Sequence, residues 1–131
     1  LNLNDSIVNI ATKLMGIQYL WGGKSSFGFD CSGFVQTVYL LTGIDLPRDS
    51  KDQERFSSFV DITIQNASAG DLIFFSENDN ISHVGIYLND GKFIHCSGEV
   101  KINSFDSADK LYCNSLYQKF HSVKSIQKIL N

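Results

Sequence analysis

Apolar positions along the chain follow a helical spacing at first and change to shorter runs, typical of strands, further along. The apolar residues Ile7, Ile10, Ala11 and Leu14 recur at helical spacing after a polar segment at residues 4–6. This pattern predicts a capped amphipathic helix that ends near Gly16. A second helix is predicted over residues 31–42, with Asp30 as its N-cap and Gly43 just past its end.

The later apolar runs predict strands joined by turns. The predicted strands cover residues 60–65, 71–75, 83–88, 92–97, 99–103 and 119–129. Residues 71–75 are continuously apolar, which suits the middle of a sheet, and residues 76–80 form a polar connection. Helices followed by an antiparallel meander predict an α+β fold.

Two shorter segments flank the second helix. Residues 17–23 are aromatic and stopped by two glycines, so they form either an edge strand or an extended loop. Tyr19 there is either a half-buried aromatic or part of a cleft wall with a hydroxyl that can donate. Residues 50–53 fit a capping box that opens a short helix, whereas Asp49 taken alone has the pattern of a solvated charge.

Composition limits the class of protein. The chain has 131 residues, 43% apolar and 19% charged, which fits one globular domain. The net charge of −3 without a basic cluster argues against nucleic acid, and no apolar run reaches the roughly 20 residues of a membrane span. Three cysteines make a disulfide framework improbable. Because the chain starts at Leu1 and not at Met, we expect a fragment or a processed form of a longer protein.

Cys31 is the first candidate for chemistry. It falls in the first turn of the predicted helix, where free backbone N–H groups and the helix dipole stabilise an anion. Cysteines in such positions have pKa values of about 3.5–7.5, against about 8.5 when free, so we expect a reactive thiolate. The alternative is a small, inert cysteine on an apolar helix.

The register of one hairpin decides whether two histidines can cooperate. A two-residue loop at 90–91 would place His83 and His95 on opposite faces. A three-residue loop at 89–91, with a glycine bulge, would place Gly85 opposite His95 and both histidines on one face as diagonal neighbours. We expect the three-residue loop, because its sequence suits that turn.

This register predicts that Cys96 points away from both histidines, which weakens a four-ligand zinc site formed with Cys31. The remaining groups fit a nucleophile, a base and an orienting partner. Cys31 would attack, His83 would take its proton and later protonate the leaving amine, and His95 would orient His83. The Cys31 backbone N–H, with the Tyr19 hydroxyl, would hold the oxyanion.

These residues lie in motifs that resemble the NlpC and p-sixty superfamily of cell-wall cysteine peptidases. The similar blocks are residues 19–23, 29–34, 46–49, 70–75, 82–87 and 93–95. The resemblance implies a papain-like α+β fold, with the nucleophile helix packed against a central antiparallel sheet. It also implies a Cys31, His83 and His95 triad that hydrolyses peptidoglycan peptides without metal or another cofactor, usually at the bond from γ-D-glutamate to a diamino acid.

Tyr-Leu-Trp-Gly-Gly and Leu-Pro-Arg-Asp are similar to the branch that acts on free stem peptides with an N-terminal L-alanine. That similarity implies that Tyr19 and Asp49 hold the α-amine, and that Ser32 and Ser50 lie near the D-glutamate carboxylate. The oxyanion and substrate-binding candidates are Tyr19, Asp30, Ser32, Asp49, Ser50 and Ser82. Members of that branch carry Src-homology-like barrel domains before the catalytic domain. The resemblance therefore implies that residues 1–131 are one catalytic domain from the C-terminal part of a longer protein, either an excised domain or one that differs in specificity.

Three functions remain open at this point. The first is the γ-D-glutamyl-diamino acid endopeptidase. The second is another thiol amide hydrolase, such as an N-acetylmuramoyl-L-alanine amidase, and the third is a wall-peptide-binding module without activity. In each case the partner is a peptidoglycan-derived peptide, and we expect a location in the bacterial cell envelope or outside the cell rather than in the cytoplasm.

Overall fold

Helices cover one face of a curved antiparallel sheet in the computed structural model, which describes residues 2–18, 23–25 and 28–126. The helices are α1 (Leu3–Lys13), α2 (Cys31–Leu41), α3 (Ser50–Glu54), α4 (Asn114–Gln118) and the 3-10 helix η1 (Ile64–Asn66). The strands are β1 (Lys24–Ser25), β2 (Gly28–Phe29), β3 (Val60–Ile62), β4 (Leu72–Glu77), β5 (Asn80–Asn89), β6 (Lys92–Ser97), β7 (Glu99–Ser104) and β8 (Phe120–Ser125).

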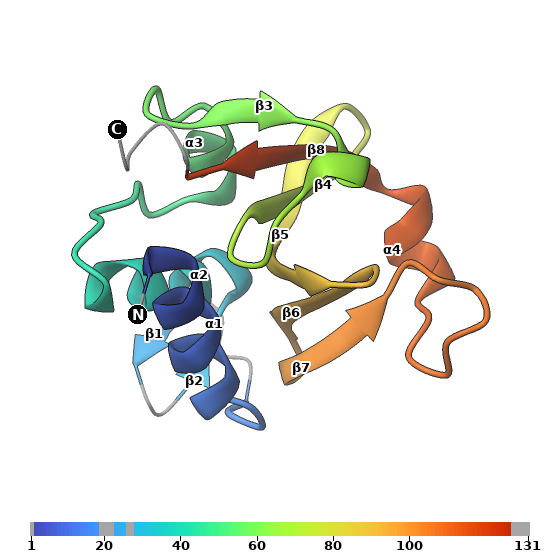
Figure 1. The fold of residues 1–131 in the computed structure, drawn as a ribbon, viewed down its shortest axis with the longest axis horizontal. Helices are drawn as coiled ribbons and strands as arrows, with labels where there is room; N and C mark the ends of the chain where they lie inside the picture. The colour runs from blue at the N-terminus through green and yellow to red at the C-terminus, as the bar shows by residue number, and fades with distance from the viewer. Residues whose placement is uncertain (1, 19–22, 26–27, 127–131) are drawn as a thin grey trace.

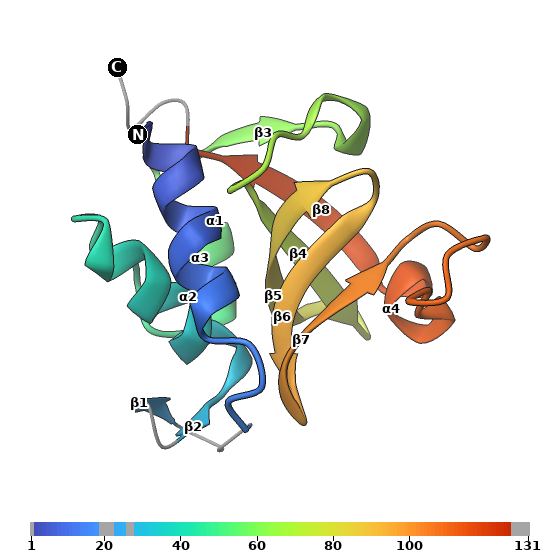
Figure 2. The same ribbon diagram turned by 60° about the horizontal axis from the view of Figure 1, so that its bottom comes forward.

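The main sheet has the strand order β3-β8-β4-β5-β6-β7, and each neighbouring pair is antiparallel. Figure 2 shows α1, α2 and α3 on one side of this sheet and α4 on the other. The predicted α+β fold is therefore confirmed. No helix in the described part of the chain is both long enough and apolar enough to cross a membrane.

Strand β4 lies at the centre of the core. Leu72 and Phe74 pack into the cluster between the sheet and the helices, and Ile73 and Phe75 pack into a second cluster on the opposite face. All four side chains are fully buried. A strand buried on both faces needs a continuous apolar run, which explains why its position was predictable.

Helix α2 begins as the sequence predicts. The Asp30 carboxylate accepts a hydrogen bond from the Gly33 N–H at 2.6 Å, which satisfies one of the free amides of the first turn. Beyond Thr42 the chain leaves the helix at Gly43, whose φ of +93° is left-handed. Cys31 is consequently the first residue of the helix.

The β5–β6 hairpin has the predicted pairing but a different loop. Gly85 lies opposite His95, as expected. The loop, however, contains only Asp90 and Gly91, both with positive φ, and the extra residue is a bulge at Leu88 in β5. A bulge shifts the register by one residue wherever it lies, so the three-residue loop was wrong while the pairing that followed from it was right.

The first helix begins earlier than predicted. Asn2 is the N-cap of α1, and its side chain accepts from the Asp5 N–H at 2.8 Å. Asn4, in the predicted cap segment, instead donates to the Ala69 carbonyl at 2.7 Å. Its side chain therefore joins α1 to the loop before β4, a contact that local sequence does not specify.

The predicted capping box at the start of α3 does not form. Asp49 is the N-cap, and Ser50 is the first helical residue. The Gln53 amide donates to the carbonyls of Ser32 at 3.1 Å and Pro47 at 2.9 Å. This fully buried side chain is thus used to join α3 to α2 and to the proline loop.

Other boundaries also differ from the prediction. The predicted strand over 60–65 stops at Ile62 and continues as η1. The polar connection predicted over residues 76–80 is shorter than expected. It is a tight turn between β4 and β5 in which Asn78 and Asp79 both have positive φ. Helix α4 was not predicted, because none of its residues is fully buried and the apolar spacing is absent.

The first turn of α2 predicts an unusual response at Gly33. Alanine normally stabilises a helix interior by about 1 kcal/mol relative to glycine. A Cβ at Gly33 would instead meet the Gly23 carbonyl oxygen and the Asp30 carboxylate. We expect Gly33→Ala to lower the free energy of unfolding by about 1–3 kcal/mol, measured by urea denaturation. Asn9→Ala, on the exposed face of α1, is the control and should be neutral or slightly stabilising.

Candidate functional site

Cys31, at the start of α2, shares a cavity with residues of β5 and β6. Cys31 and His83 line one cavity of about 350 Å³, together with Ser82, Cys96, Ser97 and Gly98. The start of α2 supplies the thiol, and β5 supplies the imidazole. The structure therefore brings together two of the residues that the sequence predicts to react.

Behind His83, three polar side chains form a hydrogen-bonded row. His83 Nε2 lies 2.8 Å from His95 Nδ1, and His95 Nε2 lies 2.7 Å from Asn103 Oδ1. Asn103 Nδ2 donates to the Leu111 carbonyl at 3.0 Å. The expected contact between the two histidines is thus present. The sequence did not predict the role of Asn103. Its place in a predicted strand does not reveal how that strand, β7, pairs with β6.

This row determines where the protons are. Because the Asn103 nitrogen donates to Leu111, its oxygen faces His95 and can only accept. His95 therefore carries its proton on Nε2 and accepts at Nδ1 from the Nε2–H of His83. The Nδ1 of His83 is left with a free lone pair. It is the atom of this row that can take a proton.

Aromatic packing holds both imidazoles in place. The Phe75 ring lies 5.5 Å from the His83 ring, and the Phe93 ring lies 4.9 Å from the His95 ring, measured between centroids. A Cβ at Gly85 would lie 3.1 Å from the His95 Cβ and 3.2 Å from the Ile94 carbonyl oxygen, so a larger residue at this paired position would force these neighbours to shift. The orientation of the two rings is therefore set by close packing as well as by hydrogen bonds.

Burial keeps the two histidines neutral. It lowers the pKa of His83 to about 3, and the charges of His95, Lys119 and Lys101 act in the same direction. Burial also lowers the pKa of His95 to about 4, although the hydrogen bond to Asn103 opposes this. At neutral pH, His83 is consequently a neutral imidazole whose Nδ1 can accept a proton.

The expectation of a lowered pKa at Cys31 is wrong. Burial raises the pKa of the Cys31 thiol, and the negative charge of Asp30 raises it further. Backbone hydrogen bonds from Val84, Ser32 and Cys31 itself act in the opposite direction but are outweighed. The resting site is therefore a neutral thiol beside a neutral imidazole, and the sulfur becomes a nucleophile only when a base removes its proton.

An ionic cluster surrounds the start of α2. Arg48 Nη2 lies 2.8 Å from the Asp30 carboxylate, and Arg48 Nη1 donates to the Ser32 hydroxyl at 2.9 Å. Asp30 and Ser32 are thus tied to each other and to the loop after Pro47. Both predicted residues lie beside Cys31 in the chain, but their polar atoms already have partners within the protein.

The other predicted substrate-binding residues are distributed differently. Ser82 lines the Cys31 cavity. Asp49 is exposed and Ser50 half-buried at the start of α3, and within the described ranges neither lines that cavity. Tyr19 lies outside the described residues.

Cys96 lies on the helix side of the sheet, as predicted. Its side chain is fully buried, and its thiol donates to the Phe29 carbonyl at 3.2 Å. The histidine row lies on the opposite face with Phe75 and Phe93. Cys96 borders the Cys31 cavity together with His83. Among the residues that the structure describes, however, no group of three or more His, Cys, Asp or Glu side chains is arranged to hold a metal ion.

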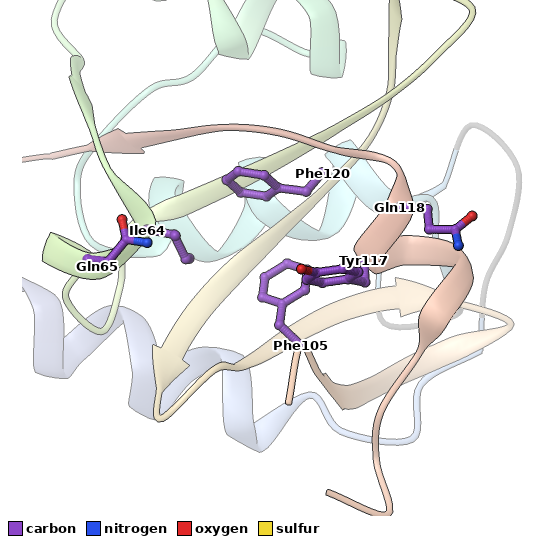
Figure 3. Close-up of a pocket in the computed structure, with 6 residues that line it drawn as sticks. All are labelled: Ile64, Gln65, Phe105, Tyr117, Gln118 and Phe120. Atoms are coloured by element: carbon purple, nitrogen blue, oxygen red, sulfur yellow. The ribbon is translucent and has the colours of Figure 1, made fainter. Parts of the chain in front are cut away.

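A larger hollow of about 560 Å³ lies behind the sheet, away from the helix layer. It is lined by Ile64, Gln65, Phe105, Tyr117, Gln118 and Phe120. Figure 3 shows the rings of Phe105, Tyr117 and Phe120 grouped around it. These side chains offer neither a nucleophile nor a base at neutral pH, so the chemistry points to the Cys31 cavity.

Comparison with known proteins identifies the family and the fold. The model of the NlpC/P60 family matches residues 16–124. A gamma-D-glutamyl-L-lysine dipeptidyl-peptidase of Bacillus cereus is 43% identical over 94 residues, which are 70% of this chain and 28% of that protein. A solved NlpC/P60 family protein from Bacillus cereus superposes with a TM-score of 0.81 at 31% identity, covering 95% of this chain and 40% of the other. The NlpC/p60 domain of the peptidoglycan hydrolase SagA superposes with a TM-score of 0.78 at 35% identity. The match covers 95% of this chain and 99% of that domain.

The neutral histidines predict a pH-dependent stability. Their folded pKa values of about 3 and about 4 lie below the unfolded value of about 6.5, so the unfolded chain binds more protons in between. The free energy of unfolding should therefore fall by about 2–4 kcal/mol from about pH 7.5 to about pH 5, measured by urea denaturation.

Variants at the histidines separate this effect from other titrations. The double variant His83→Gln with His95→Gln should lose most of the dependence. His121→Gln is the matched control and should keep it, because His121 is exposed. A flat profile for the unmodified protein would contradict the prediction, because it would show that folding leaves the pKa values of the two histidines unchanged.

Proposed function

This chain belongs to the NlpC/P60 family, and we propose that it is a cysteine peptidase of peptidoglycan stem peptides. We further propose that it cleaves the bond between γ-D-glutamate and a diamino acid, without a metal. The observation that carries the proposal is the convergence of the Cys31 thiol and the His83 imidazole on one cavity. The name of the B. cereus relative supports the choice of bond.

The proposed reaction begins with proton transfer. His83 Nδ1 takes the proton from Cys31 Sγ as the sulfur attacks the carbonyl carbon of the scissile amide. The carbonyl oxygen becomes an oxyanion, which the Cys31 backbone N–H stabilises, and Tyr19 is the proposed second donor. His95 and Asn103 keep the receiving lone pair of His83 directed at the sulfur.

The second half of the reaction returns the proton. The imidazolium of His83 protonates the leaving amine, the carbon–nitrogen bond breaks, and a thioester to Cys31 remains. Water then attacks the thioester, with His83 again taking the proton, and the acid product leaves as the thiol re-forms. The charge on the imidazolium exists only between these steps, so the buried site stays neutral at rest.

The acyl part of the substrate would lie over the start of α2. We propose that Tyr19 and Asp49 bind its α-amine, and that Ser32 and Ser50 lie near the D-glutamate carboxylate. Such a substrate would place the protein in the bacterial cell envelope or outside the cell.

Mass spectrometry of a defined peptide tests this function. L-alanyl-γ-D-glutamyl-diaminopimelate and its L-lysine counterpart should each be incubated with the protein. We expect release of the free diamino acid by the unmodified chain and no release by Cys31→Ala, because alanine cannot form the thioester. Circular dichroism should show that Cys31→Ala remains folded, and turnover by this variant would contradict the assignment.

The same readout, with a muropeptide as the substrate, distinguishes the two alternatives. An amidase would release the whole stem peptide from a muropeptide and would leave the γ-D-glutamyl bond intact. A binding module would retain the peptide without any product. Binding alone does not require a thiol and a neutral imidazole in one cavity, so this geometry favours hydrolysis over a binding module.

Asn103 provides a separate test of the proton arrangement. Asn103→Leu removes the acceptor for His95 Nε2–H, so the wrong tautomer becomes populated. We expect kcat to fall by about ten- to a hundredfold, part of the effect that a general base contributes, with little change in KM. Asn103→Asp keeps an acceptor oxygen and should restore most of the loss. Equal activity of Asn103→Leu and the unmodified protein would exclude this positioning role.

A further inference from the structure

A second cavity adjoins the one beside Cys31. It has a volume of about 340 Å³ and shares Ser82, His83 and Ser97 with the first. Its remaining lining residues are Glu77, His95, Lys101, Asn103, Cys113, Ser115, Leu116 and Lys119. The two cavities therefore meet at His83, and one contains the nucleophile while the other contains two lysines.

The two lysines differ in how their charge is balanced. Lys119 Nζ lies 3.6 Å from the Glu77 carboxylate, which neutralises much of its charge. Lys101 is exposed, and within the part of the chain that the structure describes it has no ion-pair partner. An unpaired cation on the wall of a cavity attracts an anionic group of a ligand.

Strand pairing places Lys101 beside the reacting groups. Its Cα partner on β6 is His95, so both side chains lie on the same face of the sheet. Asn103 follows two residues later on that face. The charge of Lys101 also contributes to the lowered pKa values of His83 and His95, as expected for a cation close to both rings.

The direction of the reaction assigns each cavity to a part of the substrate. The acyl carbon must lie at Cys31, and the leaving nitrogen must lie within reach of His83. The residue that carries the leaving nitrogen therefore extends past His83. The lysine-lined cavity shares His83 with the Cys31 cavity, so the leaving residue is assigned to it.

We propose that Lys101 binds a carboxylate of the leaving diamino acid and so selects substrates that carry a negative charge on that residue. The inference rests on the proposed function. The carboxylate has two possible sources, which are the free α-carboxylate of a tripeptide and the side-chain carboxylate of diaminopimelate.

Three substrates separate these sources. The first is L-Ala-γ-D-Glu-L-Lys, whose last residue has only an α-carboxylate. The second is its C-terminal amide, which has no carboxylate there. The third is L-Ala-γ-D-Glu-diaminopimelate amidated at the α-carboxylate, which keeps only the side-chain carboxylate. The readout is the ratio of kcat/KM for each acid to kcat/KM for the amide.

We expect one or both acids to be preferred, and Lys101→Gln to reduce that preference by about two- to fivefold, the range of an exposed ion pair. Lys101→Glu should reduce it further, because it places a like charge beside the carboxylate. High salt should reduce it in the unmodified protein, since the interaction is screened. Taking a ratio removes any effect of Lys101 on His83 that all three substrates share.

Lys13→Gln is the matched control, because Lys13 is an exposed lysine at the far end of α1. This variant should leave the ratio unchanged. Hydrolysis with the same ratios in Lys101→Gln and the unmodified protein would overturn the inference and leave the peptidase function intact. Failure of the unmodified protein to release a diamino acid from any of the three peptides would overturn both.

Discussion

The hydrogen bond between His83 and His95 depends on the register at which β5 and β6 pair. A shift of one residue would send one imidazole to the other face of the sheet, where the helices and Cys96 lie. The bulge at Leu88 sets this register, and Gly85 leaves the space that the His95 side chain needs. The proposed chemistry thus depends on one extra residue in a strand.

Burial then decides the charge of the site. Two imidazoles in contact with phenylalanine rings are costly to protonate, and a buried thiol beside Asp30 is costly to ionise. The site consequently rests as neutral groups linked by directed hydrogen bonds. Asn103 orients this network because its own amide is anchored on the Leu111 carbonyl. In the proposed reaction, charge separation is confined to the transition state and the intermediates, where it would accelerate the chemistry.

Most of the fold was predictable where local sequence and packing agree. Asp30 caps a helix whose apolar face is buried, and β4 is apolar because both of its faces are covered. The prediction was wrong where a polar side chain has a distant partner. Asn4 bonds Ala69 instead of capping α1, and Gln53 bonds two carbonyls instead of closing a capping box. Such partners are invisible to local spacing.

The sequence by itself determined the family motifs, the helix that presents Cys31 and the pairing that brings His83 to His95. These follow from short-range spacing and from the alternation of faces along a strand. Only the tertiary structure decided that the thiol rests protonated, that Asn103 orients His95 and that Lys101 borders the site. Burial, amide orientation and strand register across β6 and β7 depend on residues far apart in the chain, so no local pattern contains them.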